Sequence, residues 1–207
     1  MARPFARHRI LDLDYYGRVL HGNYSPAIQE RVAECWEHFK ALERIGHPII
    51  PYVSAWREGG EGIWYEFVSQ NLLQMLGCAH SEIAAVFRKS VVDLRMYSQR
   101  YLEVGILKRV IDQEELRDIR HTLREEAKKA GYIEAIYKVA LPGAQWVWLK
   151  DQAVVENYPK DQICLSIGCL TVVSREMEAE AEQERLLLQL REDLGRIRKT
   201  LIQGQFL

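Results

Sequence analysis

The sequence predicts an α+β fold in which five strands form an antiparallel sheet between an N-terminal and a C-terminal helix. Two strand-like runs flank a glycine-rich turn, and three more follow one another with short connections. Short connections favour antiparallel neighbours. A leucine repeat near the C-terminus indicates a helix that packs against another helix. We therefore expect an N-terminal arm and helix over residues 1–48, a folded domain over 49–175 and a C-terminal helix over 176–207.

The composition is that of a water-soluble globular protein, with 48% hydrophobic and 28% charged residues. The 28 Lys and Arg residues nearly balance the 29 Asp and Glu residues, whereas nucleic-acid binders usually carry a strong basic excess. No apolar run approaches the roughly 18 residues that span a bilayer, and the basic start lacks the apolar core of a secretory signal. We expect a cytoplasmic protein that contacts neither nucleic acid nor membrane directly.

Motifs of catalysis and metal binding are absent from the sequence. It has no glycine-rich phosphate loop, no His-Glu-x-x-His and no Gly-x-Ser-x-Gly. The cysteines form no Cys-x-x-Cys pair and have no histidine at ligand spacing; they are Cys35, Cys78, Cys164 and Cys169. These patterns indicate buried thiols in a reducing compartment and a protein that is not an enzyme and binds no metal.

The first helix is predicted over residues 26–45. Ser25-Pro26 combines a hydroxyl cap with proline at the first helical position, and Gly46 and Pro48 end the helix. Its apolar stripe consists of Ile28, Val32, Cys35, Trp36, Phe39 and Leu42. This stripe must pack on the sheet or on a second subunit.

The first two strands are predicted at Ile49–Trp56 and Ile63–Val68, joined by the turn 57–62. The pattern of apolar residues predicts a helix from Ser69 to Leu76 and another from about Ser81 to Leu102.

The middle of the chain predicts a helix and three strands. Asp112 and Glu115 form a capping box, and Gly131 ends the helix. Its buried face is predicted to be Leu116, Ile119, Leu123, Ala127 and Ala130. The strands are Tyr132–Leu141, Gln145–Glu156 and Ile163–Ser174. Period-two alternation places Ile133, Ala135, Tyr137 and Val139 on one face, and Trp146 with Trp148 on a common face of the next strand.

The C-terminal segment is predicted to be a helix over residues 175–203. Five glutamates crowd its first turns, where negative charge favours a helix N-terminus. A seam with 3-4-3-4 spacing follows: Leu187, Leu190, Leu194, Ile197 and Leu201. This seam favours a homodimeric coiled coil, and packing on its own domain is the alternative.

Two strands, helices, three strands and an exit helix resemble the order of a PAS domain over about residues 49–175. Phe67–Gly77 with Ser81–Ile83 is similar to the strand-into-helix signature of the family, with Ser69 in place of Asn. Asp112–Leu116 resembles the acidic opening of the long helix. Tyr137–Val139, the Pro142-Gly143 turn and Trp146-Val147 are similar to the central hairpin.

The end of the domain departs from the family. Gly168–Arg175 resembles the family's last strand and its junction, with Val172 in place of Asp and Arg175 in place of Glu. The acidic pairing that typically couples the core to the output helix is therefore missing. The connection 84–111 is also longer than usual, and we expect it to enlarge or cover a ligand cavity.

The resemblance implies a PAS-like five-stranded sheet with helices on one face, which senses a small ligand or cofactor and passes its state to an effector in signal transduction or transcription regulation. Apolar walls between sheet and long helix favour a small apolar or aromatic ligand. The candidate ligand-binding residues are Phe67, Met75, Ile119, Leu123, Ile133, Tyr137, Trp146 and Cys169.

Two cofactors of the family are disfavoured by residue context. His121 points away from the buried face of its helix, which argues against haem. Cys78 lies at a helix end without the reactive-cysteine motif of flavin photosensors. The alternative function is a ligand-free dimerisation or scaffold module, in which the aromatic residues simply fill the core.

Overall fold

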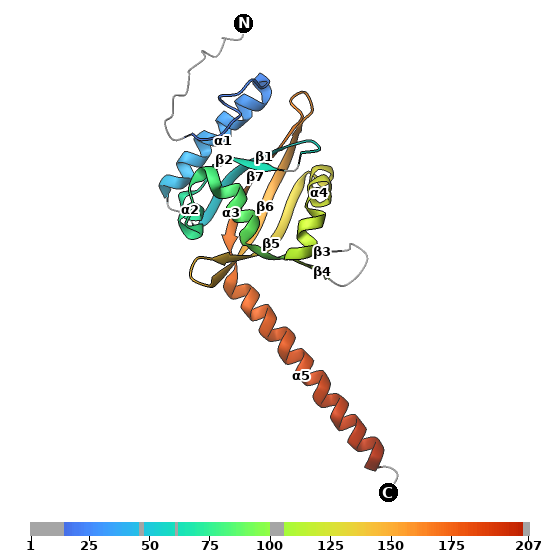
Figure 1. Ribbon diagram of the computed structural model, residues 1–207. Helices are drawn as coiled ribbons and strands as arrows, with labels where there is room; N and C mark the ends of the chain where they lie inside the picture. Colours follow the sequence, from blue (N-terminus) through green and yellow to red (C-terminus); the bar gives the residue numbers. More distant parts are fainter. Residues whose placement is uncertain (1–14, 46–47, 61, 100–105, 205–207) are drawn as a thin grey trace.

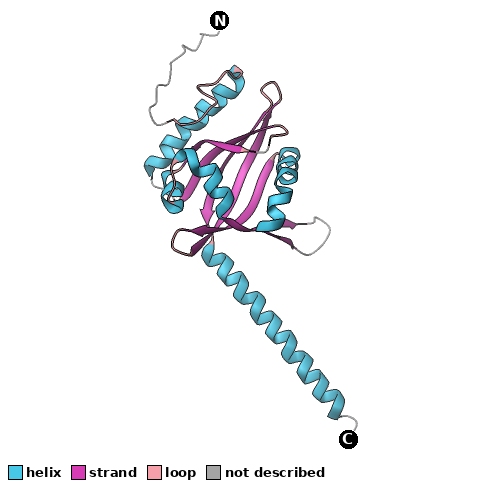
Figure 2. Cartoon of the chain, in the orientation of Figure 1, coloured by secondary structure: helices cyan, strands magenta, loops and turns pink. Residues whose placement is uncertain are grey.

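The computed structural model describes residues 15–45, 48–60, 62–99 and 106–204 (Figure 1). These described residues form one seven-stranded antiparallel sheet with helices on both faces (Figure 2). The strand order is β2-β1-β7-β6-β5-β3-β4, so the first two strands lie beside the last. The α+β class is confirmed, but the predicted count of five strands is wrong.

The elements follow the predicted order except for one added hairpin. Their bounds are α1 (Pro26–Ile45), β1 (Ile49–Arg57), β2 (Ile63–Val68), α2 (Gln70–Leu76), the 3₁₀ turn η1 (His80–Glu82), α3 (Ile83–Ser90), β3 (Val91–Gln99), β4 (Ile106–Asp112), α4 (Gln113–Ala130), β5 (Tyr132–Leu141), β6 (Gln145–Tyr158), β7 (Ile163–Val172) and α5 (Ser174–Gly204).

The predicted helix over 81–102 is wrong from Val91 to Gln99, and its residues 100–102 lie outside the described residues. The chain is helical in η1 and α3 and then continues as β3, which pairs with β5 on one side and with β4 on the other. From Asp93 to Tyr97 apolar and polar residues alternate, which suits a strand with one buried face. The described strands of the segment 84–111, β3 and β4, therefore extend the sheet beyond β5.

Helices α2, α3 and α4 cover one face of the sheet, called here the inner face. Its core joins α2 and α4 to the middle strands through residues that include Leu72, Ile83, Leu116, Val139 and Leu149. The predicted buried face of α4 is correct for Leu116, Ile119, Leu123 and Ala127, but Ala130 is exposed.

Helix α1 packs on the opposite, outer face, over β1, β2 and β7. Trp36 and Phe39 stack on each other and contact Phe67 of β2. The first alternative for the stripe of α1, packing on the sheet, is therefore the observed one. None of the described helices covers most of the outer face of β5 and β6 (Figure 1).

The segment before α1 is held by Glu66, which is fully buried. The Glu66 carboxylate accepts hydrogen bonds from the Tyr15 hydroxyl and the Trp64 indole, and from the Val19 backbone N–H at 3.0 Å. A Cβ at Gly17 would overlap this carboxylate, so the close approach requires glycine.

Candidate functional site

A polar cluster lies within the otherwise apolar inner core. Asp151 of β6 is 5% exposed and accepts a hydrogen bond of 2.7 Å from the Tyr52 hydroxyl of β1. Tyr137 of β5 also hydrogen-bonds to Asp151, and the Tyr52 hydroxyl lies 3.3 Å from Ser166 Oγ of β7. Four strands thus contribute one group each to the cluster Tyr52, Tyr137, Asp151 and Ser166, which we call the Tyr–Asp cluster.

Burial sets the protonation of this cluster. Removal from water raises the pKa of Asp151 from 3.8 to about 7, and the hydrogen bonds from Tyr52 and Tyr137 oppose this rise only in part. Burial and the nearby carboxylate also raise the pKa of both tyrosines, which stay neutral. Near neutral pH Asp151 therefore exchanges between a charged and a neutral form inside the core.

Five of the predicted ligand-binding residues belong to the inner core, and one of them, Tyr137, is a member of the cluster. Met75, Ile119, Leu123, Ile133 and Tyr137 are all half-buried against the inner core. They come from α2, α4 and β5, so the structure brings them to one side of the sheet as the sequence predicts.

The other three, Phe67, Trp146 and Cys169, lie on the outer face and cannot line a cavity between the sheet and α4. Trp146 is 62% exposed, and the neighbouring inner position of β6 is Val147. Cys169 pairs with Gln152, another outer residue.

Phe67 is displaced by an irregularity in β2. The register with β1 passes from Val53↔Phe67 to Ser54↔Tyr65, so no residue of β1 lies opposite Glu66. This extra residue in β2 turns Phe67 to the outer face.

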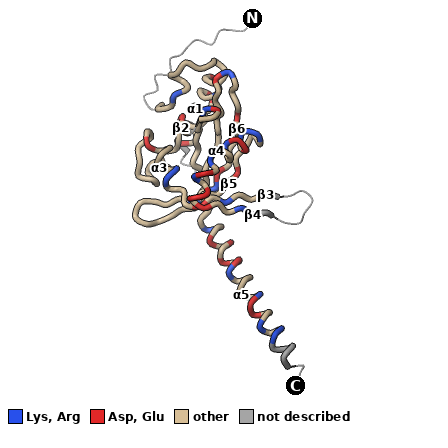
Figure 3. Tube along the Cα trace, turned by 45° about the vertical axis from the view of Figure 1, so that its right-hand side comes forward, with Lys and Arg blue, Asp and Glu red and all other residues tan. Residues whose placement is uncertain are grey.

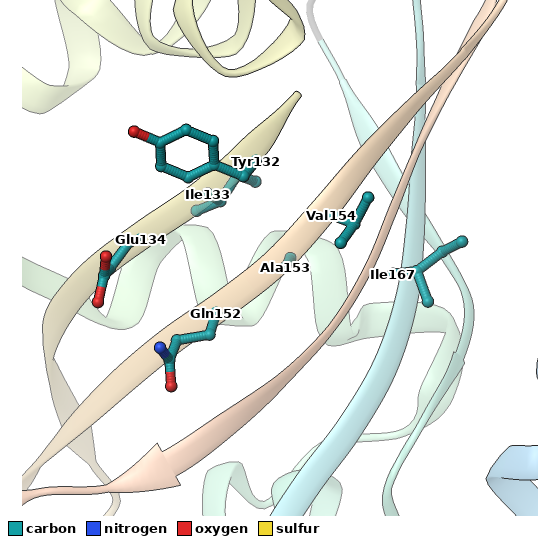
Figure 4. Close-up of a pocket in the computed structure, with 7 residues that line it drawn as sticks. All are labelled: Tyr132, Ile133, Glu134, Gln152, Ala153, Val154 and Ile167. Atoms are coloured by element: carbon teal, nitrogen blue, oxygen red, sulfur yellow. The ribbon is translucent and has the colours of Figure 1, made fainter. Parts of the chain in front are cut away.

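Two hollows of the described surface lie elsewhere. One is a shallow depression of about 330 Å³ on the outer face of β5 to β7, where Tyr132, Glu134, Gln152 and Val154 stand around it (Figure 4). The other, of about 640 Å³, lies beside α2 and η1, next to Tyr16 and His80. Neither opens between the sheet and α4, where the side chains of the inner core pack together.

The exit helix α5 docks on the sheet at its first turns. The Val173 N–H donates to the Trp148 carbonyl at 2.9 Å, and the Trp148 N–H donates to Ser174 Oγ at 3.0 Å. Met177 is only 4% exposed. Trp148 is three residues from Asp151 on the same strand, so the docking point and the Tyr–Asp cluster share β6.

Beyond these turns α5 extends away from the domain (Figure 1). The predicted seam residues Leu187, Leu190, Leu194 and Ile197 are each more than half exposed. The side chain of Leu201 lies outside the described residues. Packing of the seam on its own domain is excluded for the four described positions, so their apolar surface is available to a partner.

Sequence reasoning missed Asp151, although a signal was present. Residues 149 to 155 of β6 alternate between buried and more exposed positions, and Asp151 falls on the buried side with Leu149 and Ala153. An acidic residue at an apolar position of an alternating strand indicates a functional or specially paired group.

Metal and membrane features add little to the site. Within the described ranges no group of three or more His, Cys, Asp and Glu residues could hold a metal ion. His121 is exposed on α4. No helix in the described part of the chain is long and apolar enough to cross a membrane.

The chain has a distant likeness to a sensory protein. Its sequence matches no protein-family model and no curated protein. The crystal structure of a sensory box histidine kinase/response regulator from Burkholderia thailandensis E264 aligns with 73% of this chain and 97% of its own, at 10% identity and a TM-score of 0.44. A likeness of this size establishes neither a common family nor a common function.

Proposed function

We propose that this chain is a PAS-type regulatory domain that senses a small ligand in its inner core and transmits its state through a dimeric α5 to an effector. The observation that carries the proposal is the position of α5. The start of this helix is hydrogen-bonded to β6 near the Tyr–Asp cluster, and the rest of the helix extends from the domain with exposed leucine side chains. A helix of this kind supports transmission of a change in the sheet to a partner.

The leucine seam supports a second copy of the chain as the first partner. Its 3-4-3-4 spacing suits knobs-into-holes packing, and identical seams are self-complementary in a parallel pair. The effector is then reached from the far end of the paired helices.

The Tyr–Asp cluster supports the sensing role, because few polar groups among apolar walls are typical of a ligand site. A ligand that enters between β5 and α4 displaces Ile119 and Leu123, which are only half-buried. Asp151 then accepts a hydrogen bond from it. A ligand that binds one arrangement of the core better shifts the population toward that arrangement.

Dimerisation is tested with a matched pair of substitutions on one helix. Leu190→Lys removes a seam residue, whereas Leu188→Lys changes a leucine of nearly equal exposure, 59% against 56%, on another side of α5. Light scattering of the full chain should give the mass of two chains for the natural protein and for Leu188→Lys, and a shift toward one chain for Leu190→Lys. The same mass for all three proteins would contradict the dimeric relay.

Ligand sensing is tested by native mass spectrometry and absorption spectroscopy of the protein as purified. A co-purifying small molecule that is lost in Tyr137→Phe or Asp151→Ala supports the sensor. The alternative, a ligand-free dimerisation module, is favoured by the many apolar side chains that pack together in the inner core. A protein that purifies empty and keeps its dimer would support this alternative.

A further inference from the structure

We propose that the β3–β4 hairpin is the element that couples the inner core to α5. The inference rests on the proposed function, since it names the route by which a change in the core reaches the output helix. It also gives a role to β3 and β4, two strands that the sequence did not predict. Figure 3 shows the hairpin beside the first turns of α5.

The hairpin holds α5 through two carboxylates, those of Glu180 and Glu184. Glu180 of α5 accepts a hydrogen bond of 2.9 Å from the Tyr97 hydroxyl of β3, and its other oxygen lies 3.1 Å from Lys108 Nζ of β4. Lys108 also binds Glu184, one turn further along α5, at 2.8 Å. The side chains of Lys108 and Glu180 are 22% and 30% exposed, so water screens this network less than an open surface pair.

Arg95 of β3 ties the same network to the start of α5. Its Nη1 lies 3.7 Å from Glu180 Oε2, and its guanidinium carbon lies 4.2 Å from the ring centre of Trp148. The backbone of Trp148 in turn binds the first residues of α5. Tyr97, Lys108 and Arg95 therefore fix the direction in which α5 leaves the sheet.

The other face of the hairpin belongs to the inner core. Leu94 is 3% exposed, and Ile111 is fully buried. Leu94 pairs with Tyr137, a member of the Tyr–Asp cluster. Adjacent side chains of β3 point to opposite faces of the sheet. Leu94 therefore packs beside the cluster, whereas Arg95 contacts the output helix.

The hairpin also ends in the cap of α4. Asp112, the last residue of β4, accepts hydrogen bonds of 2.9 Å from the backbone N–H groups of Glu114 and Glu115. A displacement of α4 by a ligand therefore moves β4, and Lys108 carries that displacement to α5.

Hydrogen exchange of the full-length protein tests this clamp. Lys108→Gln and Glu180→Gln should each raise the exchange of amides 177–184 by about three- to tenfold, the range of a partly screened ion pair. Lys150→Gln is the matched control, because Lys150 pairs with Glu134 on the sheet without contacting α5. The double variant should add little to either single change. Unchanged exchange in both single variants would overturn the clamp.

Coupling is tested by combining the clamp variant with a change in the core. Asp151→Asn should alter the exchange of amides 177–184 in the natural background and leave it unaltered when Glu180→Gln is present. An equal effect in both backgrounds overturns the role of the hairpin, since the signal would then bypass it. No effect of Asp151→Asn in either background contradicts the proposed function and leaves the Lys108 and Glu180 result standing on its own.

Discussion

Replacing Asp151 with asparagine should remove a pH-dependent weakness from the centre of the fold. Burial raises the pKa of Asp151 to about 7, so the folded protein favours the neutral carboxyl. A group with a raised pKa stabilises fully below its unfolded pKa, and this stabilisation is lost as pH rises through the folded pKa. The loss therefore falls between about pH 4 and pH 7.

The size of the effect follows from linkage. One pKa unit corresponds to about 1.4 kcal/mol, so the full difference between 3.8 and about 7 amounts to roughly 4 kcal/mol. Part of this loss of stability has already occurred at pH 5, because the carboxyl of the unfolded chain is mostly ionised at that pH. Between pH 5 and pH 8 the ionisation of Asp151 should lower the free energy of unfolding of the natural protein by about 3 kcal/mol. Asparagine does not ionise, so position 151 contributes no such change in the variant.

Urea denaturation of both proteins from pH 5 to pH 8 measures this difference directly. The stability of Asp151→Asn minus that of the natural protein should rise with pH by about 3 kcal/mol. Comparing the two proteins at each pH cancels the titration of other groups, such as Glu156, whose pKa is lowered by Arg31. A difference that stays flat across this range would refute the raised pKa and the reasoning about the cluster.

Three further substitutions follow from the same contacts. Tyr52→Phe removes a hydrogen bond that favours the ionised Asp151, so the fall in stability should move to higher pH in the same urea series. Gly17→Ala places a Cβ against the Glu66 carboxylate and should lower the free energy of unfolding by about 1–3 kcal/mol; Gly62→Ala, with open space around it, should not. Gly195→Ala, also in open space on α5, should stabilise the helix by about 0.5–1 kcal/mol, measured as a later loss of the helical circular dichroism signal on heating; an earlier loss would contradict a continuous α5.

Most elements could be predicted because their ends carry local signals. Ser69 caps α2 by accepting from the Asn71 N–H, and Gly77 ends that helix in the left-handed conformation. Asp112 caps α4 as expected, although Glu115 binds Arg109 instead of completing the capping box. Such caps depend on residues only a few positions apart, so one sequence suffices to read them.

The misses depend on contacts between distant segments. The alternation from Asp93 to Tyr97 becomes a strand only because β5 offers an edge to pair with. The outward turn of Phe67 follows from the shifted register with β1. The partners of Glu180 lie more than 70 residues earlier, on β3 and β4. These pairings join segments far apart in the chain, so local sequence patterns do not predict them.

The relay from core to output helix can be measured as a distance between the two α5 helices of a dimer. A spin label introduced at Gln189, an exposed position of α5, through a noncanonical amino acid leaves the native cysteines untouched. Pulsed dipolar spectroscopy should give one distance distribution for the natural protein and a shifted one for Asp151→Asn. Identical distributions, or no dipolar signal between the labels, would contradict transmission through a paired α5.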